Sequence, residues 1–376
     1  MSIRTFQAIV TSSVLAITAL VGAGVPLEAS ASTCTNLSRL SGWTNSRLAM
    51  QTIAVPVSEN YVASAASEVS AGAGGLLLFG SWAPSNLGSQ LASLKTRVPG
   101  GIGLLVMTDE EGGGVQRMSN LVGYLPWAAW MGSHWSAAQI QYAVYNVATK
   151  MYRYGVNMDL APVVDVDGRN VPPSSTNPDG WRSFSGNTAV VTRDGIAFMN
   201  GLRSGHVVPV LKHFPGLGYA SGNTDYGPAH TLPWTTLQTV ALPPFVQAMR
   251  SGAPAVMVSN ATVPGLATNP ASLSPAVMRE LKTTLGFHGL VMTDSLSAGA
   301  ISAAGYSVPA AAVKALSVGA DMVMFGLQST PTATANLTFA VRSAIVSAVT
   351  SGRLARSRLI FAAASVLASR HVNLCA

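Results

Sequence analysis

The segment KHFPGLGYASGNTDYG, residues 212–227, decides how this chain folds and where its site lies. An apolar run at residues 207–211 leads directly into Lys212 and His213, and a glycine-containing loop with a carboxylate near its end, Asp225, follows. A buried strand that ends in polar side chains and a loop is typical of a site at the C-terminal edge of a parallel sheet. The segment therefore predicts a pocket with fixed polar groups and a mobile acid.

Short apolar or β-branched runs recur along the chain, and stretches with helical periodicity separate them. The predicted strands are residues 52–56, 75–80, 103–108, 157–166, 207–213, 255–259, 290–293 and 322–326. The clearest predicted helices are residues 139–154, 192–203 and 308–318. Alternating strands and helices indicate a parallel sheet covered by helices. Eight strands favour a single-domain α/β fold, a (β/α)8 TIM-type barrel, with a doubly wound open sheet as the alternative.

Polar side chains gather at or near the C-terminal ends of these predicted strands. They are Asp109, Asp165, Lys212, His213, Asn260 and Asp294. In a barrel, this end of the strands is where catalytic sites are built. No Pro/Ser-rich linker, repeat or low-complexity tract divides residues 32–376, so we expect one domain there.

Composition narrows the class of protein. The chain has 376 residues, 48% hydrophobic and 10% charged, and its net charge of +7 is spread without a Lys/Arg cluster. Nucleic-acid binding is therefore not expected. His206, His213 and His230 lack a metal-binding spacing, and neither a phosphate-binding Gly-Lys-Ser/Thr motif nor Gly-x-Ser-x-Gly is present. We expect no metal and no cofactor.

The first 31 residues resemble a secretory signal. Arg4 precedes an apolar stretch at residues 8–25, and Ala29-Ser30-Ala31 is a small-x-small cleavage site. We expect a secreted protein, with no stable membrane insertion after cleavage; an uncleaved anchor is the alternative. The two cysteines, Cys34 and Cys375, are predicted to form a disulfide, because the ends of a barrel are neighbours. Two free thiols are the alternative.

Three segments carry residues suited to chemistry. In LVMTDSLSAGA, Asp294 comes at the end of a buried strand, where it is suited to be a nucleophile or an electrostatic stabiliser; a helix cap is the alternative. In MTDEEGGGVQR, Asp109 is suited to a sugar diol and Arg117 to a polar substituent, and the three glycines let backbone approach a ligand; a solvated loop is the alternative. Lys212 is suited to a sugar hydroxyl, and His213 to orienting a carboxylate.

A fourth segment, WRSF, places Arg182 between two aromatic residues. It is expected to supply a further arginine to the pocket, with a surface arginine as the alternative. The sugar diol expected at Asp109 makes a carbohydrate the expected partner, and we expect the protein to be a monomer.

Together these segments resemble glycoside hydrolase family 3, in the single-barrel branch that holds β-N-acetylglucosaminidases. DEEGGGVQR, RSF, KHFPGLG and GFHGLVMTDSLSA match that branch's motifs in order, and PASLSP between them is also similar. The resemblance covers roughly residues 45 to 330. It implies a barrel and retaining hydrolysis through a covalent glycosyl-enzyme intermediate. It makes Asp294 the nucleophile, and it places the non-reducing-end sugar against Asp109, Arg117, Arg182, Lys212 and His213.

The loop after KHFPGLG departs from the family. The branch has D-S-H there, in which the Asp orients a His acid/base, whereas this chain has Asn223-Thr224-Asp225. We expect Asp225 to replace the His, with a pKa raised by the nearby Asp294, and Asn223 to hydrogen-bond it. His230 is a lesser candidate for the acid. Two further departures are Ala298 at the family's Met and Asn260 where a His is common.

The resemblance implies an exo-glycosidase that removes terminal β-linked GlcNAc from cell-wall or chitin fragments. A β-glucosidase-type hydrolase of the same family is the second hypothesis, because this chain has lost the D-S-H sequence that marks the hexosaminidase branch. A wall-sugar-binding barrel that has lost turnover is the third. Aryl glycosides distinguish these hypotheses, since a good leaving group needs little help from an acid.

Overall fold

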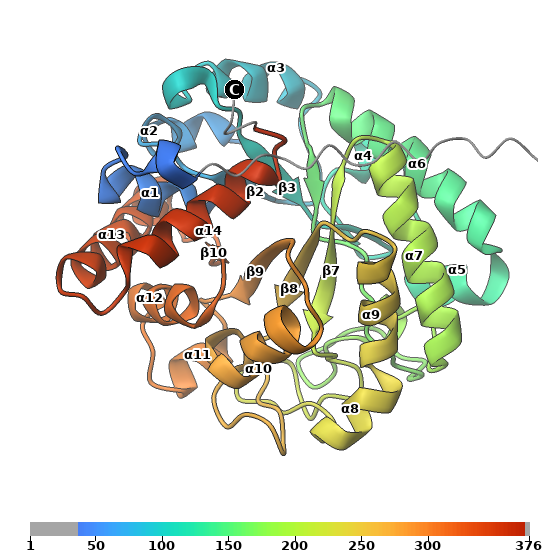
Figure 1. Cartoon of the computed structure of the whole chain (residues 1–376). Helices are drawn as coiled ribbons and strands as arrows, with labels where there is room; N and C mark the ends of the chain where they lie inside the picture. Colours follow the sequence, from blue (N-terminus) through green and yellow to red (C-terminus); the bar gives the residue numbers. More distant parts are fainter. Residues whose placement is uncertain (1–36, 373–376) are drawn as a thin grey trace, which may run out of the picture. The chain divides into compact units, whose positions relative to one another are not determined.

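The computed structural model describes residues 37–372, which form a closed barrel of eight parallel strands surrounded by helices (Figure 1). The strand order around the barrel is β1-β10-β9-β8-β7-β6-β3-β2. The strands are β1 (Ile53–Ser58), β2 (Gly75–Phe79), β3 (Leu105–Thr108), β6 (Met158–Asp159), β7 (Val208–Phe214), β8 (Ala255–Val258), β9 (Leu290–Ser295) and β10 (Met322–Met324). Each overlaps one of the eight predicted runs, and β1, β7 and β9 extend one or two residues beyond theirs. The predicted barrel is therefore confirmed, and the open sheet is wrong.

The helices alternate with the strands and cover the outside of the barrel. Their bounds are α1 (Asn45–Gln51), α2 (Ala66–Ser70), α3 (Leu87–Lys95), α4 (Ser119–Val122), α5 (Ala128–His134), α6 (Ala137–Arg153), α7 (Thr188–Ser204), α8 (Trp234–Val240), α9 (Leu242–Arg250), α10 (Pro275–Arg279), α11 (Gly299–Ala303), α12 (Val308–Val318), α13 (Pro331–Thr350) and α14 (Arg356–Ala368). The three predicted helices correspond to α6, α7 and α12. Side-chain caps fix several starts; Ser136 and Gln139 form a capping box at α6.

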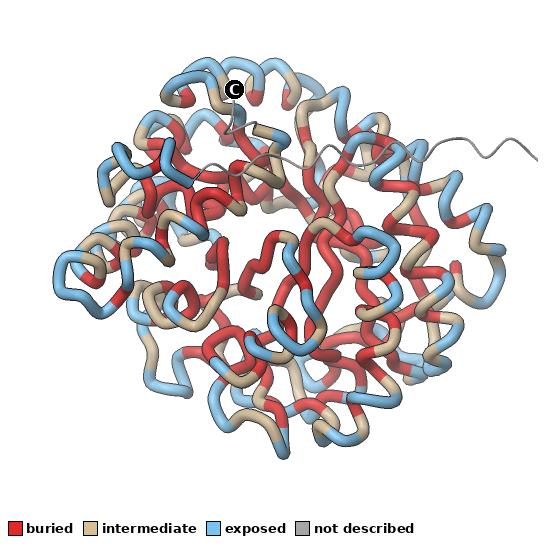
Figure 2. Tube along the Cα trace, in the orientation of Figure 1, coloured by how far each residue is buried: buried red, intermediate tan, exposed pale blue. Residues whose placement is uncertain are grey.

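Alternate residues of each strand face two different cores. One set packs inside the barrel, and six of its members are methionines: Met107, Met158, Met257, Met292, Met322 and Met324. The other set, which includes Ile53 and Val106, packs outward against the helices. Figure 2 shows the strands buried, while the outer sides of the helices are exposed. A strand buried on both faces needs apolar residues throughout, which explains the continuous apolar runs in the sequence.

The first and last described elements lie together where the barrel closes. β1 pairs with β10, and the Arg356 guanidinium of α14 donates to the carbonyls of Ser41 and Trp43 at 2.9 and 2.7 Å. Cys34 and Cys375 lie outside the described residues, as does the proposed signal at residues 1–31. Within residues 37–372, no helix is long and apolar enough to cross a membrane.

One strand pair lies outside the barrel. β4 (Glu110–Gly112) and β5 (Val115–Gln116) form an antiparallel hairpin directly after β3. The hairpin carries the acidic segment DEEGGGVQR over the C-terminal end of the barrel. It thereby brings two glutamates, Glu110 and Glu111, to the predicted site.

Candidate active site

Lys212 is the centre of a buried ion-pair network at the C-terminal end of the barrel. Its ammonium nitrogen lies 2.7 Å from an oxygen of Asp109 and 2.6 Å from an oxygen of Glu111, and its side chain is only 2% exposed. Lys212 belongs to β7 and Asp109 follows β3, so the network joins loops from different strands. A buried ammonium needs such partners, because an isolated charge is costly to remove from water.

Glu111 connects Lys212 to Arg182. The guanidinium of Arg182 donates to both oxygens of Glu111, at 2.7 and 2.8 Å, in a two-pronged pair. Burial opposes ionisation of Glu111, but Arg182 and Lys212 outweigh it and hold the pKa of Glu111 below its usual range. The three side chains therefore form one rigid charged unit that presents cationic donors at the barrel mouth.

The β4–β5 hairpin is held by a second glutamate, Glu110. Its carboxylate accepts from Gln116 Nε2 at 2.9 Å and from the backbone amides of Arg117, at 2.7 Å, and Met118. Burial raises the pKa of Glu110 to about 7. The hairpin brings the Arg117 guanidinium to 3.7 Å from Asp109, so the predicted sugar-binding pair is adjacent.

The hairpin glycines have a different role from the one predicted. The indole of Trp127 covers Gly113, and a Cβ on that residue would lie 2.0 Å from the ring. A Cβ on Gly112 would lie 2.2 Å from the carbonyl oxygen of Pro126. These two glycines therefore allow close packing of the chain against itself, and the expectation that they admit a ligand is corrected.

His213 is fixed by Asp165. Its Nδ1 lies 2.6 Å from Asp165, whose carboxylate also accepts from the backbone amides of His213 and, at 2.6 Å, Leu217. Burial, helped by the nearby Arg182, lowers the pKa of His213 to about 4. Burial also raises the pKa of Asp165 to about 7. Both shifts favour an uncharged imidazole, which lies 3.5 Å from the Arg182 guanidinium.

Asp294 lies at the end of β9, where it is half-buried and faces the same mouth. The backbone amide of Ser295 donates to its carboxylate at 2.6 Å, which orients the side chain. Burial raises the pKa of Asp294, His213 opposes this, and the carboxylate of Asp225 raises it further. Asp225 therefore raises the pKa of Asp294, whereas the sequence led us to expect the opposite influence, of Asp294 on Asp225.

Asp225 belongs to residues 219–230, which we call the Asp225 loop. At its base, the amide of Ser221 donates to the carbonyl of His230 at 2.9 Å. Near its tip, Gly299 and Ala300 of α11 donate backbone hydrogen bonds of 3.0 Å to the carbonyls of Asp225 and Thr224, respectively. The loop is thus docked against the helix that follows Asp294.

The Asp225 side chain itself is exposed at the mouth of the site. Loss of hydration nevertheless raises its pKa; Arg182 opposes this shift and Asp109 adds to it. These charges belong to the network around Lys212, so Asp225 lies within electrostatic reach of the groups predicted to bind the sugar. A carboxylic acid with a raised pKa at this position is chemically able to donate a proton.

Asn223 contributes to the loop backbone. Its amide nitrogen donates to the carbonyl of Ser174 at 3.0 Å, and its amide oxygen accepts from the backbone N–H of Asp225 at 3.0 Å. Both polar atoms are therefore used on backbone groups. Asn223 fixes the Asp225 loop rather than the carboxylate of Asp225, which differs from the bond expected from the sequence.

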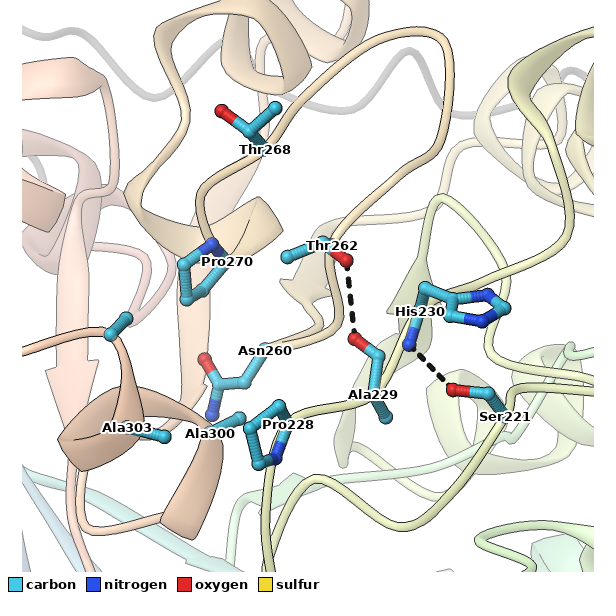
Figure 3. Close-up of a pocket in the computed structure, with 11 residues that line it drawn as sticks. Ser221, Pro228, Ala229, His230, Asn260, Thr262, Thr268, Pro270, Ala300 and Ala303 are labelled. Atoms are coloured by element: carbon cyan, nitrogen blue, oxygen red, sulfur yellow. Dashed lines mark hydrogen bonds between the residues drawn. The ribbon is translucent and has the colours of Figure 1, made fainter.

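A cavity of about 310 Å³ lies beside the Asp225 loop (Figure 3). His230 is at its edge, where Nδ1 lies 3.1 Å from the carbonyl of Thr231. Asn260 lines the cavity and is buried; it donates to the carbonyl of Ser295 at 2.7 Å and accepts from Ser272 at 2.6 Å. Asn260 therefore supports the residue that follows Asp294, and His230 lies at the base of the loop.

The structure also reveals an aspartate that the sequence reasoning missed. Asp179 is fully buried, and neither of its carboxylate oxygens has a hydrogen-bond partner among the described residues. Burial raises its pKa to about 8. Ligand atoms of Asp165, Asp179 and His213 lie within 4.8 Å of one another, a spacing that admits a cation. The Arg182 guanidinium, 3.8 Å from Asp179, already supplies positive charge there, so we assign no metal.

Sequence reasoning found the groups that face the site and missed the groups that hold them. Glu111, Glu110 and Asp179 were not singled out, and Asp165 was noted only as a strand-end residue. The sequence signal for Glu111 was its place in the same segment as Asp109 and Arg117. Its partners, however, come from segments far apart in sequence. Only the folded barrel brings Glu111, Arg182 and Lys212 together.

Comparison with known proteins agrees with this geometry. The family model described as glycosyl hydrolase family 3 N terminal domain matches residues 53–368. Beta-hexosaminidase LpqI of Mycobacterium tuberculosis is 36% identical over 233 residues, which are 60% of this chain and 59% of that protein. A beta-hexosaminidase of Neisseria meningitidis serogroup B is 32% identical over 203 residues, 52% of this chain and 55% of that protein. The chain thus spans less than two thirds of these curated relatives.

Solved structures give wider coverage. A family 3 glycosyl hydrolase from Mycobacterium smegmatis superposes with a TM-score of 0.77 at 34% identity, over 86% of this chain and 96% of that one. A beta-N-acetylhexosaminidase from Beutenbergia cavernae superposes with a TM-score of 0.77 at 26% identity, over 87% of this chain and 98% of that one. The family model, these structures and the barrel agree: the chain belongs to glycoside hydrolase family 3.

Proposed function

We propose that this protein is a retaining exo-glycosidase that removes terminal β-linked N-acetylglucosamine. The observation that carries the proposal is that the docked Asp225 loop brings Asp225 within electrostatic reach of Asp294. Relatives and structural neighbours named beta-hexosaminidase or beta-N-acetylhexosaminidase support the choice of sugar.

In this mechanism, Asp294 attacks the anomeric carbon and forms a covalent glycosyl-enzyme. Asp225 donates its proton to the departing oxygen, and it then takes a proton from the water that hydrolyses the intermediate. Asp294 must be ionised and Asp225 protonated in the first step. The raised pKa of Asp225 supports its role as the acid.

The ion-pair network would hold the terminal sugar. Lys212, Arg182 and Arg117 offer charged donors to hydroxyl groups, and Asp109 accepts from a diol. Because these side chains already hold one another, the site is organised before substrate arrives, which reduces the entropy lost on binding. His213 adds an uncharged ring beside Asp294.

A leaving-group series tests the proposal. Wild-type enzyme should cleave nitrophenyl-β-GlcNAc and chitin oligomers, and faster than the matching glucosides. Asp225→Ala should reduce oligomer cleavage far more than cleavage of aryl glycosides with good leaving groups. Asp294→Asn should lose both activities by roughly 10³-fold or more. Equal losses with good and poor leaving groups in Asp225→Ala would reject Asp225 as the acid.

The exposure of Asp225 favours a second candidate, a sugar-binding barrel with weakened turnover. Such a protein would bind GlcNAc oligomers and cleave only activated aryl glycosides. A preference for glucosides in the same series would instead identify a β-glucosidase. The proposal also includes secretion through residues 1–31 and action on cell-wall fragments. Secretion is tested by mass spectrometry of the N-terminal peptide of the protein recovered from the culture medium.

A further inference from the structure

Exposed aromatic side chains gather on one arc of the C-terminal end of the barrel. Tyr61 follows β1, Trp82 follows β2, Tyr124 follows β3, and Tyr226 follows β7, with exposures of 69%, 72%, 65% and 72%. Half-buried Trp181 follows β6. β1, β2, β3, β6 and β7 are consecutive neighbours in the barrel. Within residues 37–372, the loops after β8, β9 and β10 carry no exposed aromatic side chain.

The loops of the first half of this arc are bonded to one another. The backbone amide of Trp82 donates to Glu59 at 2.6 Å, which links the loops after β2 and β1. The side chain of Asn120 accepts from the amide of Ala83 at 3.1 Å and donates to its carbonyl at 2.8 Å. These bonds link the loop after β2 to the loop after β3, so the exposed rings stand on a continuous wall.

The second half of the arc is linked in the same way. The rings of Trp127, after β3, and Trp181, after β6, lie 6.0 Å apart at 58°. Asn223 joins the loop after β7 to the loop after β6 through its 3.0 Å bond to Ser174. Trp127 is pressed against Gly113, and the indole N–H of Trp181 donates to Asn170 at 2.8 Å. Both indoles are therefore held in place and partly exposed.

We propose that this aromatic rim (Tyr61, Trp82, Tyr124, Trp127, Trp181 and Tyr226) binds a linear carbohydrate chain that extends beyond the terminal sugar. The C–H faces of pyranose rings pack on aromatic rings, and the two indoles already held in place, Trp127 and Trp181, lose little conformational entropy on binding. The inference rests on the proposed function for the direction of the chain, whose end enters the site at Lys212.

The composition of the arc favours a glycan over a protein partner. A protein interface buries a contiguous apolar core. Val171 is the only exposed large aliphatic residue in the loops of this arc, among the residues that the structure describes. The rings instead come from the loops after five different strands, which suits contacts with successive sugars of one chain.

The test uses the full chain with Asp294→Asn, so that a bound polymer is not cut. Insoluble chitin and purified peptidoglycan sacculi are the probes, and sedimentation gives the affinity. Trp82→Ala and Tyr226→Ala should each weaken adsorption by about tenfold. The matched control is Tyr142→Ala, which removes a ring of 68% exposure on the outer helix α6 and should change nothing.

The outcomes separate this inference from the proposed function. If the parent protein adsorbs to both polymers and the rim variants do not, the result supports recognition of the β-linked chain that chitin and peptidoglycan share. Adsorption to only one polymer, lost in the same variants, identifies that polymer as the ligand. Rim variants that bind like Tyr142→Ala, or no adsorption by the parent protein, would overturn the inference. In proteins with Asp294 intact, Trp82→Ala should lower oligomer cleavage relative to nitrophenyl-GlcNAc cleavage. Failure of the proposed function would instead show as no nitrophenyl-GlcNAc cleavage by the unmodified protein.

Discussion

The carbonyl oxygen of Asp225 accepts a hydrogen bond of 3.0 Å from the backbone amide of Gly299, the first residue of α11. Asp294 lies at the end of the strand that precedes α11, so the two proposed catalytic carboxylates are connected through one short stretch of backbone. The loop that carries the proposed acid is thus positioned by main-chain hydrogen bonds. These bonds do not depend on which side chain stands at position 225.

Gly299→Ala should displace the Asp225 loop. An added Cβ would lie 2.7 Å from the carbonyl carbon of Tyr226 and 2.8 Å from the amide nitrogen of Gly227, and both atoms are backbone. We expect the kcat for oligomers to fall by about 10²-fold, with a smaller loss for good leaving groups, because the acid is misplaced.

Gly326→Ala is the matched control for that loss. It adds the same methyl group at the same end of the barrel, where the nearest atom is Ser297 Cβ at 3.6 Å. Its kinetics and melting temperature should stay close to those of the parent. A Gly299→Ala enzyme with an unchanged leaving-group profile would show that docking of the loop does not position the acid.

The pH dependence should follow the two carboxyl groups. Activity on an oligomer should rise as Asp294 ionises and fall as Asp225 loses its proton, giving a bell whose limbs lie above the ordinary aspartate range, because both pKa values are raised. The two apparent pKa values belong to the coupled pair. Asp225→Asn, measured with dinitrophenyl-GlcNAc, should keep the rising limb and lose the falling one. A falling limb that persists would assign it to another group.

Glu111→Gln should weaken both binding and stability. The amide keeps the shape of the side chain but leaves Lys212 and Arg182 without their shared carboxylate. We expect a higher KM and a loss of about 3 kcal/mol in the free energy of unfolding, as when one partner of a buried pair is removed. Glu280→Gln makes the same substitution at a half-buried glutamate that has no ion pair within residues 37–372; it is the control and should change little. Equal effects of the two changes in denaturant titrations would argue against the network.

Asp179 should make the protein less stable as the pH rises. Its folded pKa of about 8 lies above that of an unfolded aspartate, so the folded state holds the proton more tightly. This contribution to stability is complete below pH 4 and is lost as the pH approaches 8. Asp179→Asn should therefore melt like the parent at pH 4 and several degrees higher at pH 8. A difference between the two proteins that does not change with pH would contradict the assignment.

Motifs and strand ends together predicted the barrel and the side chains that face its mouth. Asp294, Lys212 and Asp109 follow apolar runs, and parallel strands bring their C-terminal ends together. The same reasoning misinterpreted Gly113, because a glycine beneath a ring and a glycine beside a ligand look alike in sequence. Glu111 was missed because the β4–β5 hairpin turns it toward Arg182, whose segment lies 71 residues further along the chain.

Oxidation of the methionines inside the barrel can report how often the barrel opens. Met107, Met158, Met292 and Met322 have no exposed surface, so peroxide reaches their sulfur atoms only when the strands separate. A thioether converted to a sulfoxide no longer fits an apolar interior. The rate of sulfoxide formation at these positions, followed by peptide mass spectrometry, thus counts the rare openings of the whole barrel under native conditions.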